Sequence, residues 1–231
     1  MTGRRTAAVT GLAALAGFAL LAAIVTARSG APLPLDSTLL SWAVGHRPAR
    51  TVTAIRTLTD TGTGAVPYVL AAVAGVIAGR TKRRKVYAAA ASLLCLGAGQ
   101  LLRRAVLYLI GRARPPAEEW ATHASGWSFP SGHATTAALA AALLITAVLL
   151  RSPPGRFLVV TVIGCWGIAV GLTRVYLGVH WFSDVIGGWL FALAWYAACA
   201  VAAARWLPPV TTPAHKDGPD PGHHAASHTS T

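Results

Sequence analysis

The chain has 231 residues, of which 54% are hydrophobic and only 12% are charged, and its formal net charge is +13. This balance excludes an ordinary soluble domain and is typical of a protein embedded in a membrane. The excess of lysine and arginine indicates membrane topology and contact with anionic lipid headgroups, and nucleic acid is not an expected partner because no soluble basic face is available to bind it.

Six apolar stretches are predicted to cross the membrane, because about 20 helical residues span a hydrocarbon core of about 30 Å. The first stretch follows Arg4 and Arg5 and resembles a signal peptide, but its apolar core is long, so we interpret it as a membrane anchor. The sequence therefore predicts an all-α fold, a bundle of six transmembrane helices. The predicted spans are 7–27, 65–79, 87–110, 133–150, 157–176 and 182–204.

Two segments are predicted to lie outside these spans. Residues 29–64 form an outer segment with one or two amphipathic helices along the membrane surface, started by Asp36 and interrupted at Pro48. Residues 206–231 are rich in Pro, His, Gly, Ser and Thr, so we expect a disordered cytoplasmic tail. The membrane domain is expected to cover residues 1–205.

Basic residues predict the orientation of the bundle. The short connection RTKRRK, residues 80–85, carries the highest density of positive charge and should face the cytoplasm. An even number of spans then places both termini in the cytoplasm. Arg28, Arg47, Arg50 and Arg56 of the first outer loop oppose this orientation, but the rule gives most weight to short loops near helix ends. We expect a protein that crosses the cell membrane several times.

Three polar clusters fall on the outer face of this topology. They are RRAVLYLIGRARPP from residue 103, FPSGHATT from residue 129 and LTRVYLGVHWFSD from residue 172. Ionisable groups at membrane depth are costly, so their gathering at one face indicates a functional site.

The third cluster contains a histidine and an aspartate four residues apart. On a helix, His180 and Asp184 share one face, and the carboxylate can accept the Nδ1 proton of the imidazole, which leaves Nε2 free to act as a nucleophile or base. The alternative is a hydrogen bond on the helix surface without chemistry. Asp184 is the one acidic residue that opens a predicted span, where a carboxylate needs a partner.

The second cluster begins a predicted helix. Pro130 and Ser131 would start a helix in an inert protein too, with Ser131 near the N-cap. Capping alone does not explain Gly132, which lowers helix propensity, or His133 in the first turn. Together they place free N–H groups, a hydroxyl and an imidazole at the positive end of a helix dipole, which is typical of an anion site with a proton donor.

Arginines accompany both clusters. Arg112 and Arg114 precede a Pro-Pro break, and Arg174 lies six residues before His180. A single arginine at the outer edge is expected to snorkel to headgroups, and this is the interpretation for Arg112. Several that converge would clamp a phosphate, because guanidinium groups match its oxygens. Too few carboxylates lie near the histidines for a two-metal site, so no metal or other cofactor is expected.

These residues resemble the type 2 phosphatidic acid phosphatase superfamily of integral membrane lipid phosphatases. The family pattern has three parts: a lysine, six residues and Arg-Pro; then Pro-Ser-Gly-His; then Ser-Arg, five residues, His, three residues and Asp. Arg114 with the proline after it matches the first part, and residues 130–133 match the second in full. Arg174, His180 and Asp184 match the third.

The resemblance implies a metal-independent hydrolysis through a phosphohistidine. His180 would attack phosphorus, Asp184 would hold its tautomer, and His133 would protonate the leaving oxygen and then activate water. The implied phosphate ligands are Arg114, Ser131, Gly132 and Arg174. The implied partner is a lipid phosphate of the outer leaflet: a polyprenyl pyrophosphate such as undecaprenyl pyrophosphate, phosphatidic acid or phosphatidylglycerol phosphate.

Two positions depart from the pattern. Thr173 replaces the serine and keeps its hydroxyl, whereas Leu107 stands in place of the lysine and leaves the site one cation short. Arg103 and Arg104 lie one turn earlier on roughly the same helix face, so either is a candidate substitute. Two alternatives to a hydrolase stay open: a phosphotransferase that uses a lipid or sugar alcohol as acceptor, and a catalytically weak membrane protein that binds lipid phosphates.

Overall fold

The computed structural model describes residues 2–206, and all regular structure within that range is helical. This agrees with the predicted all-α fold. The elements are α1 (Thr2–Ala27), α2 (Pro34–Gly45), α3 (Ala49–Asp60), α4 (Val66–Ala78), α5 (Lys82–Ile110), the 3-10 turn η1 (Ala117–Glu119), α6 (Gly132–Arg151), α7 (Arg156–Tyr176) and α8 (Phe182–Trp206).

A helix is present at each of the six predicted spans. Five of them, α1, α5, α6, α7 and α8, are long and apolar enough to cross a membrane, and the chain is a multi-pass membrane protein. The helix at the second predicted span, α4, has 13 residues. It rises about 20 Å, which is less than the hydrocarbon thickness of about 30 Å. Six crossings therefore stay a prediction.

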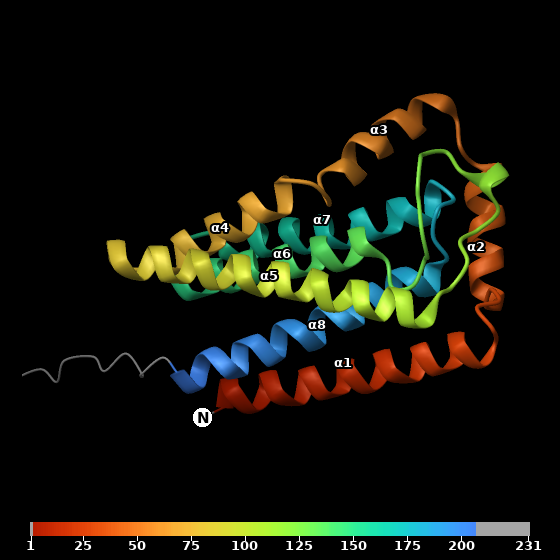
Figure 1. Ribbon diagram of the computed structural model, residues 1–231. Coiled ribbons are helices and arrows are strands. Elements are labelled where there is room, and N and C mark those ends of the chain that lie inside the picture. Colours follow the sequence, from red (N-terminus) through yellow and green to blue (C-terminus); the bar gives the residue numbers. More distant parts are fainter. Residues whose placement is uncertain (1, 207–231) are drawn as a thin grey trace, which may run out of the picture.

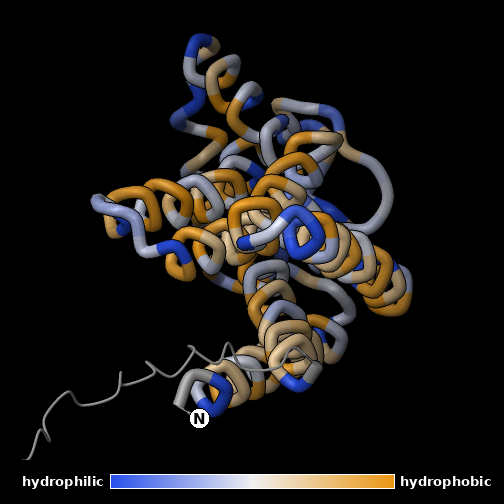
Figure 2. The backbone as a smooth tube through the Cα atoms, turned by 90° about the vertical axis from the view of Figure 1, so that its left-hand side faces the viewer, coloured by the Kyte–Doolittle hydropathy of each residue, from blue (hydrophilic) through white to orange (hydrophobic). Residues whose placement is uncertain are grey.

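The long helices run alongside one another, and both ends of the bundle have a distinct character (Figure 1). The start of α1 and the end of α8 lie at one end, together with the connections between α4 and α5 and between α6 and α7. At the other end lie α2, α3 and the long connection between α5 and α6. Hydrophobic residues follow the helices, whereas hydrophilic residues gather in the connections (Figure 2).

Helix α6 is the centre of the bundle, since it packs against α4, α5, α7 and α8. One cluster of its core is formed by small and branched side chains from four helices, namely Ala71, Leu96, Leu139 and Ala192. Helix α1 packs mainly on α8. At their contact a Cβ on Gly11 would lie 2.6 Å from the Cβ of Ala197, so only glycine permits this close approach.

Residues 29–64, the predicted outer segment, form two helices, α2 and α3, with Pro48 as the N-cap residue of α3. The break at Pro48 is thus where the sequence predicts it, whereas an orientation along the membrane surface stays a prediction. Asp36 lies in the first turn of α2, as expected of a start signal, but its side chain is buried. Of the predicted tail, residues 207–231 lie outside the described residues, and Trp206 is the last residue of α8.

Candidate active site

The three polar clusters meet at the end of the bundle where α2 and the α5–α6 connection lie (Figure 1). Gly111, with φ of 60°, ends α5 in a left-handed conformation that favours glycine. The connection then folds back, and the backbone N–H of Ser128 donates to the carbonyl of Arg112 at 2.9 Å. The N–H of Ser131 donates to the carbonyl of Asp184 at 3.0 Å, which joins the start of α6 to the start of α8.

His180 lies in the turn between α7 and α8 and is oriented through both ring nitrogens. Its Nδ1 is 3.3 Å from Oδ2 of Asp184, which also accepts the N–H of Trp181 at 2.9 Å. Its Nε2 is 3.0 Å from Nη1 of Arg114. With the ring proton on Nδ1, the imidazole donates to Asp184 and presents the Nε2 lone pair toward Arg114. The predicted histidine–aspartate pair is therefore present in the structure.

Burial and neighbouring arginines keep His180 uncharged. Only 2% of the residue is exposed, and this burial lowers the pKa of its imidazole well below the ordinary value of 6.5. The positive charges of Arg114, Arg174 and Arg103 lower that pKa further. Burial also lowers the pKa of the Arg114 guanidinium, against the opposing effect of Asp184. A neutral imidazole keeps the lone pair that a nucleophile requires.

A cavity of about 860 Å³ opens beside His180. Its wall carries most of the predicted site residues from α5, α6, α7 and the connections between them. They are Arg103, Arg104, Arg114, Gly132, His133, Arg174 and His180. The cavity is thus strongly basic and is lined by three histidines, the two predicted ones and His123, which suits a phosphate group. Asp184 and Ser131 are fully buried behind this wall.

Two buried polar atoms near the cavity have no hydrogen-bond partner among residues 2–206, the hydroxyl of Ser131 and Nε of Arg174. Ser131 occupies the N-cap position of α6, but its side chain makes no capping bond. Arg174 donates from Nη1 to the Thr59 hydroxyl at 3.1 Å, which leaves Nε free. Buried polar groups are normally paired, so these two atoms have unused hydrogen-bonding capacity.

Arg114 holds the α5–α6 connection over the cavity. Its Nε donates to the carbonyl of Gly126 at 3.0 Å, and Nη2 donates to the carbonyls of Ser125 and Trp127. Its Nη1 also donates to the carbonyl of Val179 at 2.7 Å. Arg114 therefore anchors the backbone around the site in addition to lining it.

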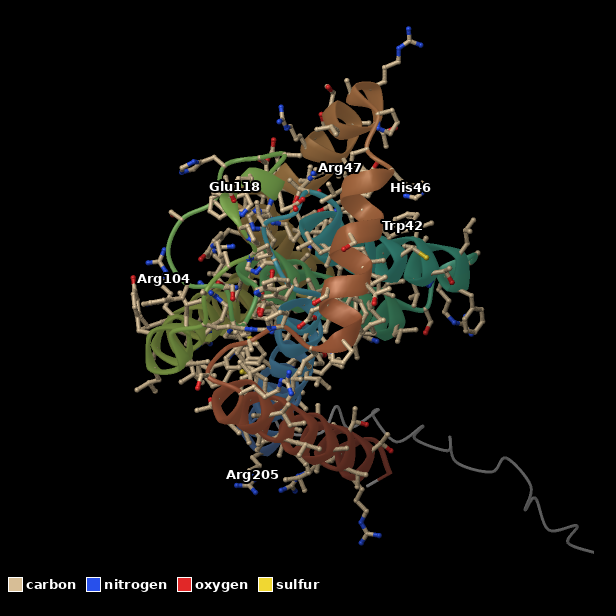
Figure 3. All side chains as sticks on the ribbon, turned by 90° about the vertical axis from the view of Figure 1, so that its right-hand side faces the viewer. Trp42, His46, Arg47, Arg104, Glu118 and Arg205 are labelled. Carbon is tan, nitrogen blue, oxygen red and sulfur yellow. The ribbon has the colours of Figure 1, made fainter. Side chains whose placement is uncertain are left out.

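The structure separates the two arginines that are candidate substitutes for the motif lysine. Arg103 is buried, donates from Nη1 to the carbonyl of Pro130 at 3.2 Å, and places its guanidinium carbon 3.3 Å from where a Cβ on Gly132 would lie. Arg104 lies at the periphery of this end of the molecule (Figure 3). Leu107 lines the same cavity. The glycine at 132 thus makes room for the Arg103 guanidinium.

Arg112 does not snorkel to headgroups, and that prediction is wrong. Its side chain is fully buried and forms ion pairs with Asp36 at 2.9 Å and Asp184 at 2.6 Å. Ser183 accepts a further bond from Arg112 at 2.7 Å. The buried roles of Asp36 and Ser183 are not apparent from the sequence. The one available signal was that Asp184 needed a partner, and the pattern did not show that the partner is Arg112.

Among residues 2–206, no group of three or more His, Cys, Asp or Glu side chains is placed to hold a metal ion. The sequence also predicts that the reaction needs no metal ion. The arrangement of side chains does not test this, so it stays a prediction. The roles of the individual site residues stay predictions as well.

Comparison with known proteins agrees with the resemblance in the motifs. The sequence profile of the PAP2 superfamily matches residues 46–208. Phosphatidylglycerophosphatase B of Bacillus subtilis (strain 168) is 32% identical over 133 residues, which are 56% of this chain and 65% of that protein. Decaprenylphosphoryl-5-phosphoribose phosphatase of Mycolicibacterium smegmatis is 33% identical over 174 residues, which are 69% of this chain and 84% of that protein.

A third relative, lipid A 1-phosphatase of Rhizobium johnstonii, is 40% identical over 115 residues. These residues are 46% of this chain and 42% of that protein, so the chain spans less than two thirds of this relative and of the Bacillus subtilis one. A crystal structure of a transmembrane PAP2 type phosphatidylglycerolphosphate phosphatase from Bacillus subtilis superimposes with a TM-score of 0.70. It is 25% identical and covers 86% of this chain and 98% of its own.

Proposed function

The chain belongs to the PAP2 superfamily, and on that premise we propose that it hydrolyses a lipid phosphate monoester or a polyprenyl pyrophosphate at the outer face of the cell membrane. One observation carries the proposal. His180 is held between the Asp184 carboxylate and the Arg114 guanidinium, and it faces a cavity lined by arginines.

The first step is the transfer of the phosphoryl group from the lipid to His180. The Nε2 lone pair attacks phosphorus, the bond from phosphorus to the lipid oxygen breaks, and a phosphohistidine forms. His133, on the cavity wall, gives its proton to the leaving oxygen, so that the lipid departs as an alcohol or a monophosphate. Asp184 accepts the Nδ1 proton of His180 in a hydrogen bond and stabilises the positive charge that the ring acquires.

The transferring group is held through its remaining oxygens. The free Ser131 hydroxyl and Arg174 Nε are donors without a partner, and Gly132 begins α6, where backbone N–H groups have no helical acceptor. Arg114 adds a guanidinium next to the nucleophile. Arg103 supplies the cation that the motif lysine would supply at position 107, because the Arg103 guanidinium lies against Gly132. Such fixed donors favour the transition state, in which charge spreads over these oxygens.

The second step releases phosphate. His133, now neutral, removes a proton from a water molecule, which attacks phosphorus and breaks the bond from phosphorus to His180 Nε2. Orthophosphate leaves, and His133 is protonated for the next cycle. The residues supply both steps without assistance from a metal ion.

The bundle supports a site at the outer face. The connection 80–85 and both described ends of the chain lie at the end of the bundle opposite to the cavity (Figure 1). If that basic connection is cytoplasmic, the cavity faces outward, and a lipid in the outer leaflet can present its headgroup there. The matched relatives are named for different lipid phosphates. They therefore support the chemistry that these substrates share and do not favour one substrate.

Phosphate release tests the proposal. The purified chain in detergent, with EDTA, is given phosphatidic acid, phosphatidylglycerol phosphate and undecaprenyl pyrophosphate without any acceptor alcohol. We expect orthophosphate from at least one of them, and a loss of at least about 10³-fold in His180→Ala. Equal rates in the two proteins would exclude the histidine mechanism, and loss of activity in EDTA would exclude metal independence. Turnover only after an acceptor alcohol is added would identify a phosphotransferase.

A further inference from the structure

Behind the nucleophile lies a buried charge cluster that the family motifs do not include. It consists of Asp36 of α2, Arg112 after α5, and Ser183 and Asp184 of α8, and none of these residues is more than 5% exposed. All five donors of the Arg112 guanidinium fork have acceptors in it or beside it, including the carbonyls of Gly30 and Ala31. Because every donor is paired, hydrogen bonds fix the position of the Arg112 guanidinium in the cluster.

Asp36 is as tightly bound as Asp184. Its Oδ2 accepts from Nη2 of Arg112 at 2.9 Å and from the Ser183 hydroxyl at 2.7 Å, and its Oδ1 accepts from the Ser183 N–H at 2.7 Å. The Leu33 N–H also donates to Oδ2 at 2.9 Å, which holds the start of α2 against the cluster. Thus Asp36 is not simply a helix start signal.

The charges in this cluster do not cancel. One guanidinium lies between two carboxylates, so the formal net charge is −1 when all three are ionised. The Asp184 carboxylate turns Oδ1 toward Arg112 and Oδ2 toward His180. If Arg112 served Asp184 alone, this pair would be neutral and little negative charge would remain for the ring. Asp36 prevents this by sharing the arginine.

We propose that Asp36 and Arg112 are positioning residues for His180: Asp36 shares the Arg112 charge, so that Asp184 keeps the negative charge that balances the ring when it becomes cationic. This inference depends on the proposed function, because it takes His180 as the nucleophile. Attack on phosphorus converts the neutral imidazole into a cationic ring that carries the anionic phosphoryl group on Nε2. The net charge of the buried cluster and the ring, without the phosphoryl group, changes from −1 to zero. A buried charge is most costly when unbalanced, so the cluster favours the phosphohistidine.

The test separates charge from packing with Asp36→Asn and Ser183→Ala in the purified full chain. Asp36→Asn keeps the shape and removes a charge, whereas Ser183→Ala removes hydrogen bonds of the same cluster and leaves its three charges in place. Formation of phosphohistidine is measured by rapid acid quench with ³²P-labelled phosphatidic acid, together with KM and inhibition by orthophosphate. Neither variant alters Arg114, Arg174 or Ser131, the proposed phosphate ligands.

We expect Asp36→Asn to slow phosphohistidine formation by at least about 30-fold while KM and orthophosphate inhibition change by less than about three-fold. Ser183→Ala should slow it by less than about five-fold. Equal losses in the two variants, or a loss in Asp36→Asn carried by KM, would contradict the charge proposal. His180→Ala is included: if it stays active, the nucleophile itself is wrong, and if it is inactive while Asp36→Asn is normal, only the present inference fails.

A second pair of variants decides the question if Asp36→Asn does not fold. Arg112→Lys keeps one positive charge between the carboxylates. Arg112→Gln removes it, so the two unpaired buried acids take up protons and the negative charge beside His180 is lost. We expect Arg112→Lys to form phosphohistidine within about ten-fold of the wild-type rate, and Arg112→Gln to lose at least about 100-fold. Equal loss in the lysine and glutamine variants would overturn the proposal, since a positive charge would then not matter.

Discussion

At the scale of single residues, the site keeps two buried donors unused in the unliganded chain. The Ser131 hydroxyl and the Arg174 Nε have no partner, and an unsatisfied buried polar group costs about 1–3 kcal/mol of stability. A well-packed bundle would not retain both without a reason. The proposed phosphate supplies the missing acceptors, so the cost in the free protein is recovered when substrate binds.

Ser131→Ala should therefore separate activity from stability. Because the hydroxyl has no bond to lose, the apparent Tm in detergent should stay the same or rise slightly. The activity should fall, with kcat/KM for phosphatidic acid lower by about 10- to 100-fold, because one donor to the transition state is gone. Steady-state kinetics and thermal unfolding of the same preparation provide both values.

Ser128→Ala is the matched control. Its hydroxyl lies within hydrogen-bond distance of the carbonyls of Arg112 and Ala113, at 3.1 Å each, so it is already paired, unlike the Ser131 hydroxyl. This variant should lose stability by about 1 kcal/mol and keep most of its kcat/KM. A Ser131→Ala protein with wild-type kinetics would show that Ser131 is a structural residue only.

The buried state of His180 predicts how stability depends on pH. The pKa of the folded imidazole is well below 6.5, so the unfolded chain binds the extra proton as pH falls through about 6.5 and the folded chain does not. The free energy of unfolding then falls by at most about 1.4 kcal/mol per pH unit. The apparent Tm should drop more between about pH 7 and about pH 5 in the wild type than in His180→Gln. Parallel pH curves would contradict a neutral buried His180.

At the scale of elements, α5 carries Arg103, the proposed substitute for the lysine of the family motif. Gln100, Arg103 and Leu107 line the cavity from one helix face, and Gln100 accepts from Nε of Arg103 at 3.0 Å. Spacings of three and four residues place these side chains one above the other. Moving the cation one turn from 107 to 103 keeps it on the same face but brings it toward α6 and Gly132.

The two arginines of α5 should therefore differ in their effect on catalysis. We expect Arg103→Ala to lower kcat/KM by about 100-fold or more, and Arg104→Ala by less than about three-fold, because only Arg103 reaches the start of α6. Adding Leu107→Lys to Arg103→Ala should restore at least about ten-fold, since it returns a cation to the cavity. The rate of phosphate release from phosphatidic acid is measured for the wild type, the two single alanine variants and the double variant.

Equal effects of the two single alanine substitutions would show that general positive charge, and not the position of Arg103, supports activity. Failure of Leu107→Lys to restore any rate, in a protein with normal Tm, would place the missing cation elsewhere. Either result would remove Arg103 from the mechanism and leave the rest of the site intact.

Most helices were predictable because each is a long apolar run, and hydrophobicity alone determines such spans. The start of α6 at Gly132 was predictable too, because Pro130 and Ser131 precede it. The length of α4 was less certain, since its apolar helix has only about two thirds of the residues that a span requires. The local pattern of apolar residues thus predicted a helix best where the apolar run was long.

Contacts between distant residues were less predictable. The motif clusters met because the topology brings the same ends of the helices together, so the cavity with Arg114, Arg174 and His180 followed from the sequence. The partner of Arg112 did not: Asp36 is 76 residues away, and a lone arginine near a helix end is equally compatible with snorkelling. No local pattern distinguishes a buried arginine from an exposed one.

At the scale of the whole molecule, the two ends of the bundle contain different features. One end gathers the basic connection 80–85 and the described ends of the chain, and the other gathers the cavity, α2 and α3 (Figure 1). The lipid proposed as substrate must reach the second end from within a leaflet. Which leaflet this is depends only on the orientation of the bundle, so orientation determines which pool of lipid the enzyme serves.

Single cysteines test the orientation in full. In a variant with the three native cysteines replaced, Ala117→Cys places a thiol on the exposed η1 turn near the cavity, and Pro154→Cys places one on the exposed α6–α7 connection at the other end. Neither change removes a lysine or arginine, so the charge distribution that sets the orientation is preserved. An impermeant thiol reagent added to intact cells should label Ala117→Cys, whereas Pro154→Cys should be labelled only after lysis. The reverse pattern would place the cavity in the cytoplasm and its substrate in the inner leaflet, while the chemistry at His180 would be unaffected.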